Sequence, residues 1–305
     1  PHSGISDHAL LVAGGAAGIA AAFNAPLAGV LFAIEELSRK LESRSSGLII
    51  TGIVLAGLIG VSFFGNHSYY GVIVVPELDW NALAPGLMVV LACGALGGLF
   101  AKLMAASLTG APERLNRVRA RFPIRFAAAG SLMIALMGLV TGGATFGAGS
   151  EAVQHMLAGH ADVPAFYVTL KFMATWLTAW CGVPGGIFAP SLSIGAGVGH
   201  NVSVLMGADI APALIAMGMA AFLAAVTQAP LTAFIIVMEM IDGHALVLSL
   251  MAAAMLASLI SRLIAKPLYE TLAMHMVAVL KNPPATEAAA PLEPAATPAA
   301  EKTSR

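Results

Sequence analysis

The chain has 305 residues, of which 58% are hydrophobic and only 10% are charged, and its mean hydropathy is +0.86. Soluble domains carry about 25% charged residues, so this composition excludes an ordinary soluble protein and predicts a helical protein that crosses a membrane several times. A net charge of −1 gives no electrostatic basis for binding nucleic acid. The two cysteines, both inside apolar runs, form neither a disulfide framework nor a metal-binding pattern. We therefore expect no nucleic-acid partner, no metal and no cofactor.

Apolar runs of about 20 residues, the length needed to cross the hydrocarbon core as a helix, recur along the chain. Four of these runs lack Asp, Glu, Lys and Arg: 47–66, 82–101, 126–150 and 243–261. Two longer runs, 172–208 and 210–238, exceed one straight span, and prolines and glycines between Pro184 and Pro190 interrupt the first. We expect these two runs to form several helices, some of which cross only part of the membrane.

The distribution of Lys and Arg predicts the orientation, because short cytoplasmic loops collect basic residues. Basic residues cluster at 39–44, 114–125 and 262–266, whereas the connections 66–80, 149–164 and 241–244 contain none. The clusters are predicted to be cytoplasmic and the basic-free connections external. Between residues 126 and 261 the only Lys or Arg is Lys171, so charge determines the topology there poorly.

A shift of 204 residues reveals an internal repeat. It aligns Ala25-Pro26-Leu27 with Ala229-Pro230-Leu231, and Glu35 with Glu239. Each copy predicts a small-residue helix that stops before the proline, followed by a segment of about 11 residues, which at 1.5 Å per residue is too short to span the bilayer. The first short segment runs into basic residues and the second into a basic-free connection. We therefore expect the two copies to have inverted topology.

The same shift predicts the organisation of the chain. The counterpart of the 184–190 loop in the first copy would fall about 20 residues before Pro1, and the first residue is Pro instead of Met. We interpret residues 1–46 as the C-terminal end of a first repeat whose N-terminal part is missing. Residues 47–280 would form the remaining transmembrane region with the second repeat. Residues 281–305, rich in Pro, Ala and Glu, predict a disordered cytoplasmic tail.

The loop from Pro184 to Pro190 has a pattern that suits an anion. Two glycines allow a sharp turn and a close approach to a ligand, and Ile187 and Phe188 then present backbone N–H groups at a helix start. Because the membrane interior offers no water to these donors, an anion is a natural partner. The alternative is a structural break between helices, with water or a carbonyl satisfying the donors.

Four segments together resemble the CLC family of chloride channels and proton/chloride exchangers, in the family's order and spacing from about Leu10 to Leu280. The segments are 14–36, with Ala-Phe-Asn-Ala-Pro-Leu and Glu-Glu; 185–190, Gly-Gly-Ile-Phe-Ala-Pro; 224–242, with Gln-Ala-Pro-Leu-Thr; and 266–269, Lys-Pro-Leu-Tyr. The resemblance implies an all-α, polytopic membrane protein, built as an inverted repeat with broken and half-spanning helices. It also implies a homodimer formed through the short helices and those that follow them.

The resemblance also implies a site. The backbone at Gly186, Ile187 and Phe188 matches the family's central chloride site, the Tyr269 hydroxyl matches a donor to the same anion, and Glu36 matches the glutamate that passes protons. Many family channels have an apolar residue at this last position, so Glu36 favours proton-coupled chloride antiport, influenced by voltage, in the inner membrane. The alternatives are a passive voltage-gated chloride channel and an inactive fragment. The family's Gly-Ser-Gly-Ile-Pro and Gly-Arg-Glu-Gly-Pro loops have no position in this sequence.

The residues alone also allow plainer interpretations. Glu35 and Glu36 could form an ordinary helix end with Arg39 and Lys40, four residues further on. Tyr269 could be an anchor at the membrane interface. We interpret Glu35 as such a salt-bridged end and Glu239 as a structural helix end.

Two further interpretations concern packing and chemistry. The spacings Gly14-xxx-Gly18 and Ala25-xxx-Gly29 allow close helix approach, and we interpret them as internal packing. We do not expect an enzyme, since the sequence has no His-Glu-x-x-His, no Gly-x-Ser-x-Gly and no paired intramembrane Asp.

Overall fold

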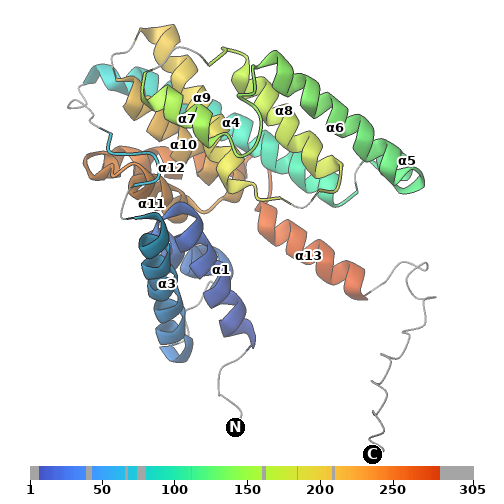
Figure 1. The fold of residues 1–305 in the computed structure, drawn as a ribbon, viewed down its shortest axis with the longest axis horizontal. Helices are drawn as coiled ribbons and strands as arrows, with labels where there is room; N and C mark the ends of the chain where they lie inside the picture. Colours follow the sequence, from blue (N-terminus) through green and yellow to red (C-terminus); the bar gives the residue numbers. More distant parts are fainter. Residues whose placement is uncertain are drawn as a thin grey trace, which may run out of the picture.

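The computed structural model describes residues 7–38, 43–65, 68–73, 80–110, 112–159, 163–183, 185–207 and 210–281, and these contain helices and no strand (Figure 1). The predictions for Arg39, Lys40, Pro184 and the tail after Lys281 lie outside these residues, and the domain boundaries at 46 and 280 stay predictions. The helices are α1 (Asp7–Phe23), α2 (Pro26–Phe32), a π-helical turn (Ala33–Ser38), α3 (Ser43–Phe64), a 3-10 turn (Trp80–Ala82), α4 (Leu83–Leu108), α5 (Glu113–Arg121), α6 (Pro123–Val140), α7 (Ser150–Leu157), α8 (Tyr167–Trp180), α9 (Phe188–Met206), α10 (Ala211–Thr227), α11 (Pro230–Met240), a 3-10 turn (His244–Leu246), α12 (Val247–Arg262) and α13 (Leu268–Lys281).

In the described part of the chain, three helical segments are long and apolar enough to cross a membrane: Trp80–Leu108, Pro123–Val140 and His244–Arg262. They confirm three of the expected spans, and α3 occupies the fourth. The two long apolar runs are broken as expected, between α8 and α9 and between α10 and α11.

Two boundaries differ from the expectation. The span predicted for 126–150 ends at Val140, because Gly142 and Gly143 adopt positive φ angles of 62° and 94°, which continue no α-helix. The connection at 149–164, expected to be a loop, contains the short helix α7, whose buried face packs on α9.

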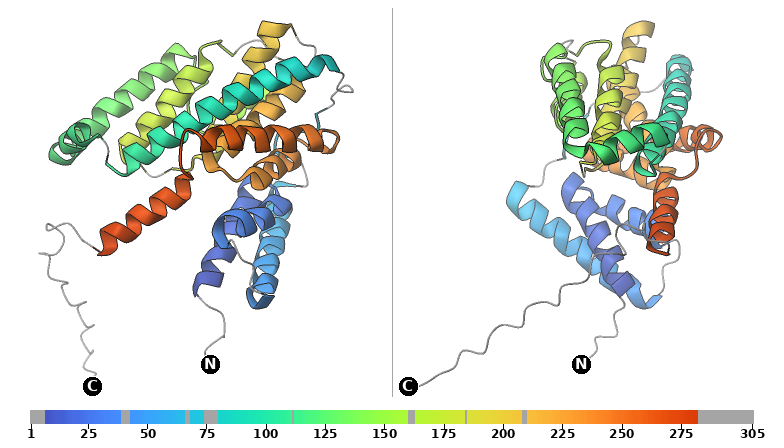
Figure 2. Two further views of the ribbon diagram at one scale, coloured as in Figure 1. Left: turned by 180° about the vertical axis from the view of Figure 1, so that it is seen from behind. Right: turned by 90° about the vertical axis from the view of Figure 1, so that its right-hand side faces the viewer.

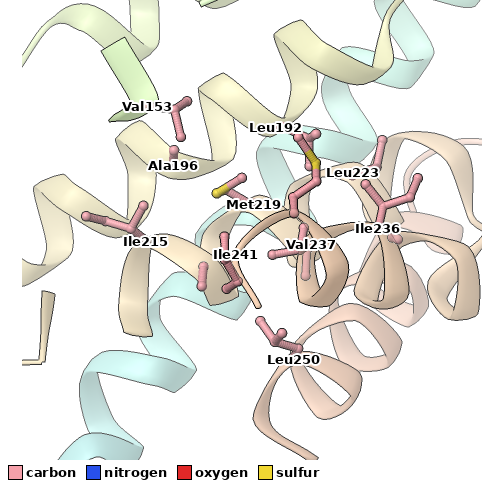
Figure 3. Close-up of a cluster of buried hydrophobic side chains, with 14 of the residues drawn as sticks. Val153, Leu192, Ala196, Ile215, Met219, Leu223, Ile236, Val237, Ile241 and Leu250 are labelled. Atoms are coloured by element: carbon pink, nitrogen blue, oxygen red, sulfur yellow. The ribbon is translucent and has the colours of Figure 1, made fainter. Parts of the chain in front are cut away.

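The core of the molecule lies around α10, which packs against α4, α9, α11 and α12. This helix is apolar on all sides and almost completely buried, as expected for a helix surrounded by others. Figure 3 shows its Ile215, Met219 and Leu223 among side chains from α7, α9, α11 and α12. In contrast, α1 and α3 pack against each other and project from this bundle in Figures 1 and 2, joined to it where α2 meets α11.

The backbone confirms the internal repeat. Asn24 ends α1 and Gln228 ends α10, and both adopt the left-handed conformation, with φ of 49° and 61°. The alanine that follows each of them has the same ψ of 77°, and the next residue is the proline that starts α2 or α11. A proline is favourable at this position because the first helical N–H needs no intrahelical acceptor. Identical turn chemistry therefore recurs at the offset of 204 residues.

The two short helices cap each other. Glu239, near the end of α11, accepts hydrogen bonds from the backbone N–H groups of Leu27 (3.1 Å) and Ala28 (2.9 Å) at the start of α2. Glu35, just after α2, accepts them from the N–H groups of Leu231 (3.1 Å) and Thr232 (2.7 Å) at the start of α11, and from the Thr232 hydroxyl (2.8 Å). Because each helix ends where the other begins, α2 and α11 are antiparallel, which confirms the inverted topology.

These contacts confirm Glu239 as a structural helix end and give Glu35 a partner that was not predicted, whereas its predicted ion pair with Arg39 lies outside the described residues. The Glu35 carboxylate binds a helix start that lies 196 residues further along the chain, a relation that spacing within one helix cannot reveal.

Helix packing at glycine confirms one predicted contact and contradicts another. A Cβ at Gly29 would lie 2.7 Å from the carbonyl oxygen of Ala16, so α2 packs closely on α1. Nothing lies within 4 Å of the corresponding point at Gly14 or Gly18, so their interpretation as internal packing sites was wrong. The closest crossing was not predicted: it joins α9 to α10, where a Cβ at Gly218 would lie 2.2 Å from the carbonyl oxygen of Gly195.

We expect Gly218→Ala to destabilise the protein by about 1–3 kcal/mol, because the added methyl group must push α9 and α10 apart. Gly14→Ala is the matched control: it also replaces a helical glycine, but nothing lies within 4 Å, so it should stabilise the helix by about 0.5–1 kcal/mol. Thermal unfolding of both variants in detergent measures the difference. Equal unfolding temperatures would contradict a tight α9/α10 crossing.

Candidate anion and proton site

Among the starts of α2, α9 and α11, only that of α9 is capped by no side chain within the described residues. Carboxylates cap α2 and α11, whereas Ile187 at the N-cap of α9 offers no acceptor. In the described part of the chain, no acceptor serves the backbone N–H groups of Ile187 and Phe188. Unpaired donors at membrane depth cost several kcal/mol each, so this helix start is suited to an anion.

Aromatic rings gather around the same helix start. The Phe188 ring lies 6.2 Å from that of Phe23, 5.7 Å from that of Phe32 and 6.2 Å from that of Tyr269, measured between centroids, and all three pairs are edge-on. These rings belong to α1, α2, α9 and α13. Edge-on packing orients rings relative to one another, so it positions Tyr269 beside the first turn of α9.

Tyr269 stands near the start of α13, which packs against α4 and α10. The chain before this helix is held by Gln228, whose side-chain amide donates a hydrogen bond to the carbonyl of Ala265 (2.9 Å). The carboxylate of Glu36 is close enough to act electrostatically on the Tyr269 hydroxyl. Tyr269 therefore contacts the Phe188 ring and feels the charge of Glu36.

Glu36 lies in the π-helical turn that continues α2. The corresponding part of the second repeat stays α-helical to Met240, so the two copies differ where the acid pair occurs. A π-helical turn inserts an extra residue and changes the direction of the side chains that follow, and such turns are frequent at functional sites. Here the Glu35 carboxylate accepts hydrogen bonds from the start of α11, whereas Glu36 lines a cavity.

Glu36 also lines a cavity of about 590 Å³ on the side where the basic residues are predicted to be cytoplasmic. Arg262 and Lys266 line the same cavity, together with Glu35 and Gln228. Glu36 is half-buried, lines this cavity and acts electrostatically on Tyr269.

The structure thus gathers the predicted residues from three distant parts of the chain. Ile187 and Phe188 form the start of α9 and Gly186 precedes it, the Tyr269 ring contacts that of Phe188, and Glu36 acts electrostatically on Tyr269. Their roles in binding chloride and passing protons stay predictions. Sequence reasoning missed the buried Lys171, although its isolation in a long apolar stretch was a usable signal.

Comparison with known proteins gives the family. The family model described as voltage gated chloride channel matches residues 2–262. The H(+)/Cl(-) exchange transporter ClcA of Vibrio parahaemolyticus is 30% identical over 292 residues, which cover 90% of this chain and 60% of the relative. The protein of the same name from Cronobacter sakazakii is 31% identical over 284 residues, covering 89% and 60%. The chain therefore spans about 60% of the length of these curated relatives.

Solved structures show the same fold. A slow cyanobacterial Cl-/H+ antiporter superposes with a TM-score of 0.71 at 24% identity, covering 91% of this chain and 67% of that one. A CLC-type fluoride/proton antiporter gives 0.68 at 23% identity, covering 87% and 65%. The chain is a membrane protein that belongs to the voltage gated chloride channel family.

Proposed function

We propose that this chain carries the anion site and the internal proton site of a proton-coupled chloride antiporter in the inner membrane. The observation that carries the proposal is the meeting of three features at one place: the uncapped start of α9, the Tyr269 ring and the carboxylate of Glu36. The named activity of the relatives, H(+)/Cl(-) exchange, supports it.

The chloride ion would be held by the backbone N–H groups of Ile187 and Phe188 and by the hydroxyl of Tyr269, with Gly186 leaving room for its approach. Amides and a hydroxyl supply partial positive charge, which attracts an anion without holding it so tightly that release becomes slow. Glu36 would carry the proton between the cytoplasmic cavity and the anion site. The structure keeps this acid separate from Glu35, whose oxygens are already engaged by α11.

The protein would act as a homodimer within the lipid bilayer. Leu27 on α2 and Leu231 on α11 occupy equivalent positions in the two repeats, and they are 56% and 42% exposed. Equivalent exposed leucines on two helices that cap each other form a small two-fold surface. Such a surface suits a symmetric contact with a second copy, which would bury both leucines.

A reversal-potential measurement tests the proposal. The purified protein is reconstituted in lipid bilayers with a chloride gradient and an opposing pH gradient. Because an exchanger moves both ions, we expect the reversal potential to shift when pH is changed at fixed chloride. A potential that follows chloride alone identifies a passive channel, and the absence of any chloride flux identifies an inactive chain. Either result contradicts the proposal.

A further inference from the structure

Helix α5 and the turn that joins it to α6 carry a group of charges that the proposed site does not use. Residues 113–125 contain five arginines and a single acid, Glu113. Within the described residues none of these arginines forms an ion pair with a carboxylate. The neighbouring helices α4, α6 and α8 contain no Asp or Glu, so the fold around α5 supplies no opposite charge. The charge of this surface is therefore left for water or for an anionic partner.

The packing of α5 determines which of its sides faces outward. Asn116 and Arg119 are half-buried, whereas every other residue of α5 is exposed. The Asn116 amide lies against Gly110, and a Cβ at Gly182, just after α8, would lie 3.7 Å from the Arg119 guanidinium. Residues three apart lie on one side of a helix, so this side attaches α5 to the bundle. Figure 1 shows α5 at the edge of the bundle, where α6 begins.

The opposite side of α5 carries arginines in a row. Arg114, Arg117 and Arg121 recur at spacings of three and four residues, and at about 100° per residue they face away from the attached side. The turn into α6 adds a fourth: the guanidinium carbons of Arg121 and Arg125 lie 5.3 Å and 5.4 Å from the centre of the Phe122 ring. Cation–π contacts thus hold two guanidinium groups beside one ring. Planar groups of this kind bind the oxygens of a phosphate through paired N–H donors.

Exposed apolar side chains lie next to these arginines. Leu115, Val118 and Phe122 are 45%, 51% and 42% exposed, and Ile124 at the start of α6 is 83% exposed. Helix α6 is long and apolar enough to cross a membrane, and only two of its glycines are buried, so most of its surface is left for lipid. Because α5 lies where α6 begins, it lies at the bilayer surface, on the side predicted to be cytoplasmic. A basic side next to an apolar side is typical of a helix in the membrane interface.

We propose that the outer side of α5 binds the headgroup of an anionic phospholipid, with the lipid phosphate at the guanidinium groups of Arg121 and Arg125. The arginines earlier in α5 extend the basic surface to neighbouring headgroups, and its apolar residues enter the boundary of the hydrocarbon. A lipid is favoured over a soluble phosphate, because only a lipid engages the apolar residues together with the arginines. The proposal concerns contact with the membrane, and it holds whichever ions the chain transports.

Lipid binding to the full chain tests the proposal. The protein in detergent is titrated with phosphatidylglycerol or with phosphatidylcholine, and bound lipids are counted by native mass spectrometry. These lipids differ in headgroup charge, so we expect phosphatidylglycerol to bind more tightly. In the double variant Arg121→Gln/Arg125→Gln its affinity should fall about tenfold or more, because each arginine near an anionic headgroup contributes about fivefold. The affinity for phosphatidylcholine should change little.

Two controls separate this surface from other sources of binding. Lys102→Gln/Lys281→Gln removes two exposed cations from α4 and α13 and should keep the preference for phosphatidylglycerol. If it loses the preference equally, the effect is one of net charge and the proposal is wrong. Glycerol phosphate has the phosphate of the headgroup but no acyl chain. If it displaces phosphatidylglycerol at equal concentration, the surface binds soluble phosphate, which also overturns the proposal.

Amide hydrogen exchange locates the bound lipid in the unaltered protein. The chain is placed in nanodiscs of phosphatidylcholine, with and without phosphatidylglycerol. Exchange over residues 113–125 should be slower with phosphatidylglycerol, because bound headgroups oppose the local opening of α5. No slowing there overturns the proposal, even where the lipid binds elsewhere, and this result is obtained whether or not the double variant folds. A preference for phosphatidylglycerol that persists in a folded Arg121→Gln/Arg125→Gln variant contradicts it as well.

Discussion

Glu36→Gln stops proton movement while chloride movement continues, if Glu36 passes protons as proposed. Gln has nearly the same shape as Glu but cannot carry a proton at physiological pH. The donors proposed for chloride, the N–H groups of Ile187 and Phe188 and the hydroxyl of Tyr269, are untouched by the change. Proton and chloride fluxes into liposomes, recorded together with a pH electrode and a chloride electrode, measure the effect.

Glu113→Gln is the matched control for this experiment, because Glu113 is an exposed acid at the start of α5. It should leave the ratio of protons to chloride unchanged. Glu35→Gln separates the two acids of the pair: it keeps an acceptor oxygen toward α11 and leaves Glu36 in place, so protons should still move. An unaltered coupling ratio in Glu36→Gln would show that this carboxylate does not pass protons.

Removal of a carboxylate cap should lower the stability of the protein. Glu239→Ala leaves the backbone N–H groups of Leu27 and Ala28 without their acceptor. The bond from Leu27 is exposed and that from Ala28 is part-buried, so the main cost is that of one unsatisfied donor, and the free energy of unfolding should fall by roughly 1–3 kcal/mol. The temperature of unfolding in detergent, followed by tryptophan fluorescence, reports the change.

The symmetry of the two caps provides an internal control. Glu35→Ala removes the equivalent acceptor from Leu231 and Thr232, and it should destabilise the protein by a similar amount. Glu239→Gln keeps one acceptor oxygen, so its effect should be smaller than that of Glu239→Ala. The exposed Glu113→Ala sets the baseline for losing an acid. If Glu239→Ala unfolds at the same temperature as Glu113→Ala, the caps contribute nothing to stability.

The two caps also explain why the adjacent acids Glu35 and Glu36 have different surroundings. Consecutive residues on a helix point in different directions, so two adjacent acids cannot both face the start of α11. Glu35 takes that position, and Glu36 lines the cavity with Arg262 and Lys266 and acts electrostatically on Tyr269. The sequence contained the acid pair but could not show which acid contacts α11, because the fold brings the start of α11 to Glu35 from far along the chain.

Much of the architecture could be predicted from the sequence, since it depends on interactions between neighbouring residues. Apolar runs marked the spans, and Pro26 and Pro230 marked the starts of the short helices, because a proline restricts its own φ and the residue before it. The repeat at 204 residues was visible because both copies use Ala-Pro-Leu to start the short helix. The order of the motifs was enough to indicate the family, which the comparisons confirmed.

Only the tertiary structure shows which of several similar sequence patterns makes a contact with another helix. Gly14 and Gly218 are both helical glycines, but only Gly218 faces another helix at close range, and local spacing contains no information on the partner. Lys171 looked like an isolated charge until the turn from α6 to α7 folded its carbonyls over the ammonium group. The sequence by itself indicated most of the apolar spans, the proline breaks and the family. Which side chains meet was decided by packing, because each such contact joins residues far apart in the chain.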